Sequence, residues 1–84
     1  MSSLLILGAG GHGKVVAETA LATQRYSSIY FLDDQLRGSV LNIPIRGPFE
    51  VAFDKGFSLG FDEAIVALGN SKKRLAFTTR LLSF

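Results

Sequence analysis

Three glycines near the start of the sequence have the spacing of a phosphate-binding turn. Gly8, Gly10 and Gly13 match G-x-G-x-x-G, and they follow a run of large apolar residues at 4–7. That run predicts a strand buried on both faces, and the residues after the glycines have the periodicity of a helix. The free N–H groups and the dipole of a helix's first turn favour an anion. The spacing therefore predicts a phosphate site, with a ligand-free structural turn as the alternative.

His12 is the only histidine, and it lies inside this glycine turn. An imidazole there could shuttle a proton or donate a hydrogen bond to a ligand. We favour the simpler interpretation that His12 is a first-turn helix residue whose ring bonds to backbone or solvent. Because the sequence has no cysteine and its spacing places no serine and acid beside His12, no nucleophilic triad can be assembled. The sequence predicts no catalytic residue and no metal site in this chain.

Two carboxylates follow the next predicted strand. Asp33 and Asp34 stand about twenty residues beyond the glycine turn. Neighbouring side chains of a strand point to opposite faces, which argues against a pair that shares one proton. An acid at this distance from the turn can accept hydrogen bonds from a nucleoside, as in dinucleotide-binding folds. The alternative is that both residues only cap the loop.

A second strand-to-helix turn is predicted at Gly69-Asn70-Ser71, and Lys-Lys-Arg follows it at 72–74. Cations in the first turn of a helix oppose the helix dipole, and a bound phosphate would remove that mismatch. Asn70 or Ser71 is expected to cap the helix and to leave backbone amides near the anion. A solvated basic face is the alternative interpretation of the three cations.

The composition is that of one small α/β domain, with 84 residues, 48% of them hydrophobic, nine glycines and two prolines. The absence of cysteine excludes disulfides and fits a reducing compartment, so the cytoplasm is the expected location. A net charge of +2 is too small to indicate nucleic acid as a partner. No apolar run reaches the length of a membrane span, and the first residues lack the basic region of a signal peptide.

The apolar periodicity predicts alternating strands and helices. A strand, a helix and a second strand of this length call for a right-handed crossover and parallel pairing. We expect a small parallel sheet with the first strand central, the second on one side and the last on the other. Both glycine turns then meet at the carboxyl edge, where such sheets bind ligands. The predicted elements are strands at 4–7, 28–32, 43–45 and 63–68, and helices at 11–24, 48–54 and 71–82. The strand at 63–68 is expected to be buried like the first, and Gly56 is expected to close the helix at 48–54.

The pattern also assigns faces to the first and last helices. The inner face of the helix at 11–24 is predicted to carry Val15, Val16, Thr19, Ala20 and Thr23. The last helix is expected to leave an exposed apolar patch that a further part of a longer protein covers. That patch consists of Phe77, Leu81 and Phe84.

Taken together, the motifs resemble the amino-terminal domain of sugar O-acyltransferases of the sialic-acid and bacillosamine type, the NeuD/PglD family. The resemblance rests on the glycine turn Gly-Ala-Gly-Gly-His-Gly-Lys-Val-Val, on Leu32-Asp33-Asp34, and on Ala67-Leu68-Gly69-Asn70 followed by Arg74. It covers essentially the whole chain. The resemblance implies an α/β fold, namely a small Rossmann-like parallel sheet flanked by helices.

In that family the first domain binds a nucleotide-sugar, commonly a UDP-linked amino sugar. A left-handed β-helix of hexapeptide repeats binds acetyl-CoA and carries the catalytic histidine. The resemblance thus implies a nucleotide-sugar-binding domain at 1–84, with the β-helix domain in a longer, homotrimeric parent. The parent is expected to transfer an acetyl group to an amino or hydroxyl group of the sugar in bacterial glycan synthesis. Residues 1–84 contain no hexapeptide repeat, so they are expected to be monomeric and not to catalyse transfer.

Carried onto this sequence, the family's binding pocket has three parts. The glycine turn would hold the phosphates or the sugar, the acid pair would contact the nucleoside, and the second turn would form the other side. The residues are Gly10, Gly11, His12, Gly13, Asp33, Asp34, Gly69, Asn70 and Arg74. His12 is then a substrate contact and not the catalytic histidine of the family.

Two other functions stay open at this point. A NAD-type dinucleotide binder uses the same kind of turn and acid, but its full site takes two mononucleotide halves and this chain offers barely more than one. An α/β interaction module without a ligand is the third possibility. It would be favoured if side chains covered the amides of Gly10, Gly11 and Gly13.

Overall fold

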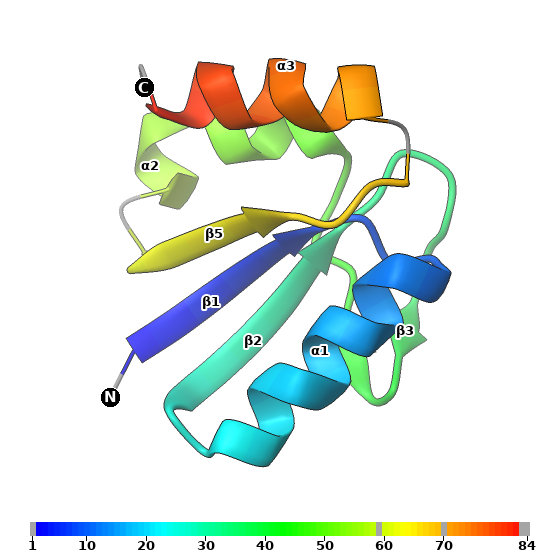
Figure 1. Ribbon diagram of the computed structural model, residues 1–84. Coiled ribbons are helices and arrows are strands. Elements are labelled where there is room, and N and C mark those ends of the chain that lie inside the picture. Colours follow the sequence, from blue (N-terminus) through cyan, green and yellow to red (C-terminus); the bar gives the residue numbers. More distant parts are fainter. Residues whose placement is uncertain (1, 59, 70, 83–84) are drawn as a thin grey trace.

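The computed structural model describes residues 2–58, 60–69 and 71–82. Its main sheet has three parallel strands in the order β2-β1-β5, as the sequence predicted (Figure 1). The first strand is central because its apolar residues have a strand on each side and a helical layer on each face. The strands are β1 (Ser2–Leu7), β2 (Tyr26–Leu32) and β5 (Glu63–Val66), and the helices are α1 (Gly11–Thr23), η1 (Phe49–Phe53), α2 (Lys55–Ser58) and α3 (Ser71–Leu82).

Helices cover both faces of the sheet (Figure 1). On one face Leu4 and Ile6 of β1 belong to a buried cluster that includes alanines of α1. On the other face Leu5 and Leu7 belong to a second cluster, which includes η1 and side chains of α3. Successive residues of β1 therefore enter different cores, which confirms a strand buried on both faces.

The predicted inner face of α1 is confirmed at Ala20 and at Val16, which packs partly buried against the core, but not at the other positions. The buried residues of α1 are Gly13, Ala17 and Ala20, which lie three and four positions apart on one side of the helix. Val15 is 63% exposed, although it was assigned to the inner face. The helix lies so close to the sheet that only residues without bulk fit directly beneath it.

The segment between β2 and β5 holds more structure than the sequence indicated. A small hairpin forms from β3 (Ser39–Val40) and β4 (Ile43–Pro44), and Ile45 continues alongside Phe31 of β2. The predicted helix at 48–54 is a 3-10 helix, η1, which follows Pro48. Gly56 does not end it, as the sequence suggested, but lies inside the short helix α2.

β5 is an exposed edge strand, which corrects the expectation of a buried strand at 63–68. Only Val66 of its four residues is buried, and Ile65 is 42% exposed. Among the described residues, β5 pairs with β1 alone, so its outer side carries no strand. An apolar run predicts a buried strand only if the sheet continues beyond it.

α3 confirms the predicted helix at 71–82, but the side of it that was expected to be exposed packs inward. Phe77 and Leu81 pack against the core that contains η1, and the Phe77 ring lies 5.3 Å from the Phe49 ring, centroid to centroid. The predicted exposed patch is therefore wrong for these two residues, and Phe84 lies outside the described residues. Leu75, on another side of α3, is the exposed apolar residue, with 68% of its surface accessible.

Candidate functional site

The two predicted turns meet at the carboxyl edge of the sheet. The Ala67 N–H donates to the Leu7 carbonyl at 2.8 Å, and the Gly8 N–H donates to the Leu32 carbonyl at 2.8 Å. A Cβ atom added to Gly8 would lie only 2.7 Å from the Ala67 carbonyl oxygen. The start of the β1–α1 turn is thus held against the end of β5 on one side and of β2 on the other. This confirms the predicted meeting of the turns.

Gly13 has a structural role within the first turn. A Cβ atom on Gly13 would lie 1.8 Å from the carbonyl oxygen of Gly8, far inside any van der Waals contact. Gly8 also has a φ of 116°, which L-residues rarely adopt. These two glycines let α1 start directly over the sheet, as the third and first glycines do in dinucleotide-binding turns.

Gly10 and Gly11 lie in open space at the start of α1. Both are exposed, and a Cβ atom added to either would meet no atom within 4 Å. No side chain within the described ranges caps the helix at Gly10, and the Lys14 N–H makes the bond to the Gly10 carbonyl at 2.9 Å. The amides of the first turn therefore point to an uncovered surface where a helix favours negative charge.

His12 is exposed on this same first turn. In the part of the chain that the structure describes, its ring makes no hydrogen bond. Because no backbone group holds the ring, the structure fits the simpler interpretation that His12 is a first-turn helix residue whose ring faces solvent. A ligand on the first-turn amides would lie next to an imidazole that is free to donate.

Asp33 ties the glycine turn to the loop after β2. Its Oδ2 accepts a hydrogen bond from the Ala9 N–H, and its Oδ1 accepts from the N–H groups of Gln35 and Leu36, each at 2.9 Å. Burial of the Asp33 carboxyl raises its pKa. The backbone donors and the charge of Arg37 lower the pKa by more, so it lies below its ordinary value of 3.8. The carboxylate is a buried, ionised anchor.

Asp34 makes a different connection and stays exposed. Its Oδ1 accepts from the Phe49 N–H at 2.9 Å, at the start of η1. None of the described groups bonds to its Oδ2. The guanidinium of Arg37 donates to the carbonyls of both aspartates, at 3.3 and 3.2 Å, and holds the loop around them. Asp34 therefore keeps one carboxylate oxygen for another partner.

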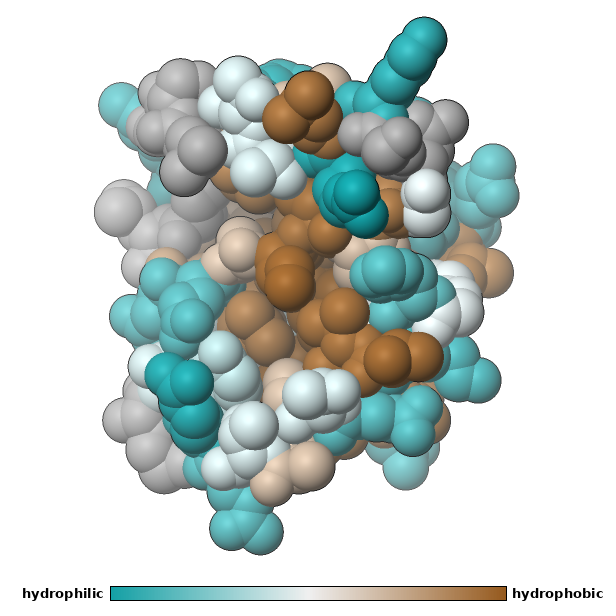
Figure 2. Space-filling model, viewed as in Figure 1, coloured by the Kyte–Doolittle hydropathy of each residue, from teal (hydrophilic) through white to brown (hydrophobic). Residues whose placement is uncertain are grey.

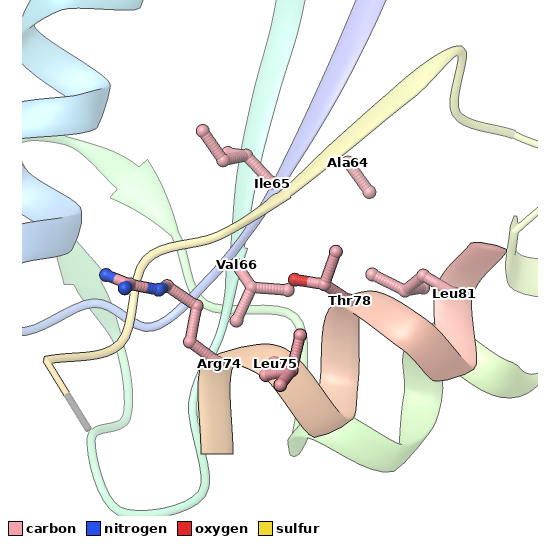
Figure 3. Close-up of a pocket in the computed structure, with 7 residues that line it drawn as sticks. All are labelled: Ala64, Ile65, Val66, Arg74, Leu75, Thr78 and Leu81. Atoms are coloured by element: carbon pink, nitrogen blue, oxygen red, sulfur yellow. The ribbon is translucent and has the colours of Figure 1, made fainter. Parts of the chain in front are cut away.

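The second turn is described only in part. Gly69 is exposed, and a Cβ atom on it would meet nothing within 4 Å. Asn70, which was assigned to the site and expected to cap α3, lies outside the described residues. Arg74 is exposed on the first turns of α3, and Figure 3 shows its guanidinium reaching toward the end of β5. No acidic residue stands in the first turn of α3.

Two hollows of the described surface lie away from the glycine turn. A hollow of about 760 Å³ lies between β5 and α3, and Arg74 is the single charged residue along its described lining. The glycine turn is an open surface beside it. Sequence reasoning missed this hollow because it treated β5 as buried.

Sequence reasoning also missed the anchoring role of Asp33. The sequence placed Asp33 at the end of a strand that neighbours the first, but only the register of the structure, in which Leu7 pairs with Leu32, brings Gly8 and Asp33 side by side. The described residues contain no group of three histidine, cysteine or acidic residues that would suit a metal ion, and no helix long and apolar enough to cross a membrane.

The fold and the turn define a class, the small Rossmann-like domains that present a glycine-rich helix start at the carboxyl edge of a parallel sheet. Within that class, the chain belongs to the family of the PglD N-terminal domain, whose model matches residues 3–81. A comparison with curated proteins finds no significant match.

Two solved structures are similar over nearly the whole chain. One is the acetyltransferase domain of PglB from Neisseria gonorrhoeae FA1090 in complex with acetyl coenzyme A. It has a TM-score of 0.87 and 40% identity, over 98% of this chain and 39% of that chain. The other is the acetyltransferase domain of PglB from the same organism. It has a TM-score of 0.90 and 40% identity, over 99% of this chain and 40% of that chain. This chain thus spans about two fifths of the length of these relatives.

Proposed function

We propose that residues 1–84 form the nucleotide-sugar-binding domain of a sugar acetyltransferase, and that the ligand is a UDP-linked amino sugar. The observation that carries the proposal is the uncovered first turn of α1, where Gly10 and Gly11 leave room for a phosphate against the backbone. A diphosphate has the charge that this helix start favours. Family membership supports a sugar acetyltransferase as the parent.

The surroundings of the turn support an anionic ligand. His12 and Arg74 are exposed on the two turns that meet at this edge, and neither helix has an acidic residue in its first turn. We assign the phosphates or the sugar to Gly10, Gly11, His12 and Gly13, with Gly69, Asn70 and Arg74 as the opposite side. The cations around the start of α3 would then have a partner that offsets their conflict with the helix dipole.

The two aspartates divide the remaining roles. Asp33 bonds to Ala9 and to the loop after β2, so we assign it to the shape of the pocket, with any nucleoside contact secondary. Asp34 has an oxygen that no described group uses, and we assign that oxygen to the nucleoside. A NAD-type binder needs its acid at the end of the second strand for a ribose hydroxyl. The backbone bonds of Asp33 occupy that acid, and Asp34 remains for a nucleoside contact in either ligand. We therefore favour the nucleotide-sugar over NAD on family membership and because a full dinucleotide site takes two mononucleotide halves.

The acetyl transfer itself belongs to the parent protein in this proposal. The gonococcal relative is described in complex with acetyl coenzyme A, and this chain covers 39% of it. We propose acetyl-CoA as the parent's co-substrate and an amino or hydroxyl group of the sugar as the acceptor. We further propose a cytoplasmic location and a homotrimeric parent, with 1–84 monomeric by itself.

Calorimetric titration of the 84-residue chain with UDP-N-acetylglucosamine, and with NAD in parallel, tests the ligand. Binding of the UDP-sugar at up to millimolar concentration, without a response to NAD, is the expected result. Gly11→Val should weaken that binding at least about tenfold, because a branched side chain blocks backbone approach to the phosphates. Ala22→Val, on the exposed part of α1 away from the turn, is the matched control and should bind normally.

A response to NAD in place of the UDP-sugar would support the second possible function, a NAD-type dinucleotide binder. Tight NAD binding with no response to any UDP compound would overturn the nucleotide-sugar assignment and favour a dinucleotide binder. A chain that binds neither compound would point to an interaction module.

A further inference from the structure

We propose that Arg37 is a positioning residue for the nucleoside side of the pocket. By holding the backbone of the loop after β2, Arg37 fixes the direction of the Asp34 carboxylate and so raises the affinity for the ligand without contacting it. The loop spans residues 33–38, between β2 and β3. The effect on affinity rests on the proposed function, whereas the effect on the loop does not.

The loop after β2 has little packing of its own. All its residues except the first are exposed, and its one large apolar residue, Leu36, is 43% exposed. Figure 2 shows the hydrophobic residues of that face gathered in a band between α3 and α1, and the loop lies beside this band (Figure 1). At its start the Asp33 N–H donates to the Gly47 carbonyl at 2.9 Å. At its end the Gly38 carbonyl accepts from the Ile45 N–H, also at 2.9 Å. Between these attached ends, polar bonds must fix the conformation.

One peptide group of the loop is held at both ends. Its carbonyl belongs to Asp34 and accepts from Nη1 of Arg37 at 3.2 Å. Its N–H belongs to Gln35 and donates to Oδ1 of Asp33 at 2.9 Å. A planar peptide group with both polar ends bonded has one orientation. The backbone that carries the Asp34 side chain is therefore fixed.

The same nitrogen of Arg37 also bonds to the carbonyls before and after this group. Nη1 donates to the Asp33 carbonyl at 3.3 Å and to the Leu36 carbonyl at 3.0 Å. Because Nη1 has only two N–H groups, at least one of them is shared between two carbonyls. Hydrogen bonds from a charged donor are roughly twice as strong as neutral ones. A single cation thus gathers three carbonyls of the loop.

The Asp34 side chain is fixed at its other end as well. Its Oδ1 accepts from the N–H of Phe49, a buried residue, at 2.9 Å. With the backbone held by Arg37 and Oδ1 held by Phe49, the remaining Oδ2 has one direction. A group that is already ordered loses less conformational entropy when a ligand binds, which raises the affinity. Oδ2 is the oxygen assigned to the nucleoside, so Arg37 acts on the ligand through Asp34.

The test compares Arg37→Gln with the wild-type 84-residue chain. Calorimetric titration with UDP-N-acetylglucosamine should show binding that is about fivefold to tenfold weaker in the variant, because the loop must be ordered on binding. Without any ligand, the NMR order parameters of the Gln35 and Leu36 amides should fall from about 0.85 toward 0.6. The melting temperature should stay close to that of the wild type, because the substitution lies on the surface.

Two further variants separate positioning from direct contact and from charge. Arg37→Lys keeps a cation with N–H groups for the carbonyls but removes Nε and Nη2, which have no hydrogen-bond partner among the described residues. Its affinity should stay within about threefold of the wild type, since an ammonium can donate to the same carbonyls. Arg25→Gln is the matched control, because it removes the same charge just before β2, at the opposite end of that strand, and should bind normally.

Salt separates the fixed loop from a long-range attraction between Arg37 and an anionic ligand. At about 0.3 M salt, charges more than roughly 6 Å apart are largely screened. The weaker binding of Arg37→Gln relative to the wild type should persist under these conditions, because the bonds of Arg37 to the loop are direct.

Three results would overturn the proposal. The first is that Arg37→Gln leaves either the affinity or the order parameters unchanged. The second is that Arg37→Lys binds as weakly as Arg37→Gln, which would make the guanidinium a direct ligand contact. The third is a loss of affinity that disappears at the higher salt concentration. A wild-type chain that binds no UDP-sugar would instead overturn the proposed function, and with it the effect on affinity, while unchanged order parameters alone would refute the hold of Arg37 on the loop.

Discussion

At the scale of single residues, the carboxylate of Asp33 controls the shape of the proposed site. It is the one buried polar side chain found among the described residues, and it bonds across 24 positions of sequence to the Ala9 N–H. The glycine turn is therefore held by a charge that belongs to the neighbouring strand.

Asp33→Ala should destabilise the domain by roughly 1–3 kcal/mol, because backbone N–H donors lose a buried, charged acceptor. Urea unfolding followed by circular dichroism measures the change. Asp34→Ala, which removes one bond from an exposed carboxylate, should cost less. Equal losses for the two variants would contradict the anchoring role of Asp33.

The contribution of Asp33 should also depend on pH. Folding lowers the pKa of Asp33, so the contribution is fully present above the unfolded pKa of about 3.9 and is lost as pH falls through the folded pKa. The stability difference between wild type and Asp33→Asn, measured in urea, should therefore be large at pH 7 and shrink below pH ~4. A difference that does not shrink below pH ~4 would show that the charge has no such role.

Substitutions of the turn glycines should have two different effects on the stability of the fold. Gly13→Ala forces a Cβ atom onto the Gly8 carbonyl and should destabilise the fold by about 1–3 kcal/mol or more. Gly11→Ala adds a methyl group in open space and should stay within about 0.5 kcal/mol of wild type. Thermal melting of the two variants measures this, and similar melting temperatures would refute the division.

At the scale of elements, α3 is attached to the sheet by aromatic contacts. The Phe77 ring lies 5.3 Å from that of Phe49 and 6.1 Å from that of Phe53, between ring centroids. The exposed ion pair between Arg80 and Glu50 connects the same two helices, with Arg80 also over the Phe53 ring. The aromatic contacts dominate, since exposed ion pairs contribute little.

Phe77→Ala should therefore destabilise the domain by about 2–4 kcal/mol, less than a fully buried phenylalanine because Phe77 is half-buried. Leu75→Ala, on the exposed side of the same helix, should change stability by no more than about 0.5 kcal/mol. Chemical denaturation of the pair measures both values. A large effect of Leu75→Ala would mean that the β5 edge is already covered in this chain.

At the scale of the whole molecule, 84 residues leave a small stability margin, so a ligand has a visible effect. If the UDP-sugar binds the folded state alone, a concentration of one hundred times Kd should raise the free energy of unfolding by about 2.7 kcal/mol. A thermal shift with UDP-N-acetylglucosamine measures this. Gly11→Val should reduce the stabilisation to about 1.4 kcal/mol or less at the same ligand concentration, since its binding is at least about tenfold weaker. An undiminished shift in Gly11→Val would place the ligand elsewhere.

The local features of the site could be predicted from the sequence because they arise from neighbouring residues. The apolar run of β1, the glycine spacing and the start of α1 depend on interactions within a few positions, and the structure has them where the pattern indicated. Parallel pairing and the central place of β1 also followed, because the right-handed crossover leaves few arrangements. The meeting of the two turns is a consequence of that topology.

Tertiary structure alone decided what covers each apolar residue. The same hydrophobic pattern left Leu75 and Ile65 exposed and Phe77 half-buried, since burial depends on which element lies opposite. Asp33 became an anchor because strand pairing brought it beside Ala9, a contact between distant parts of the chain. Sequence periodicity records the faces of an element, whereas long-range packing chooses which face meets the core and which edge of the sheet stays open.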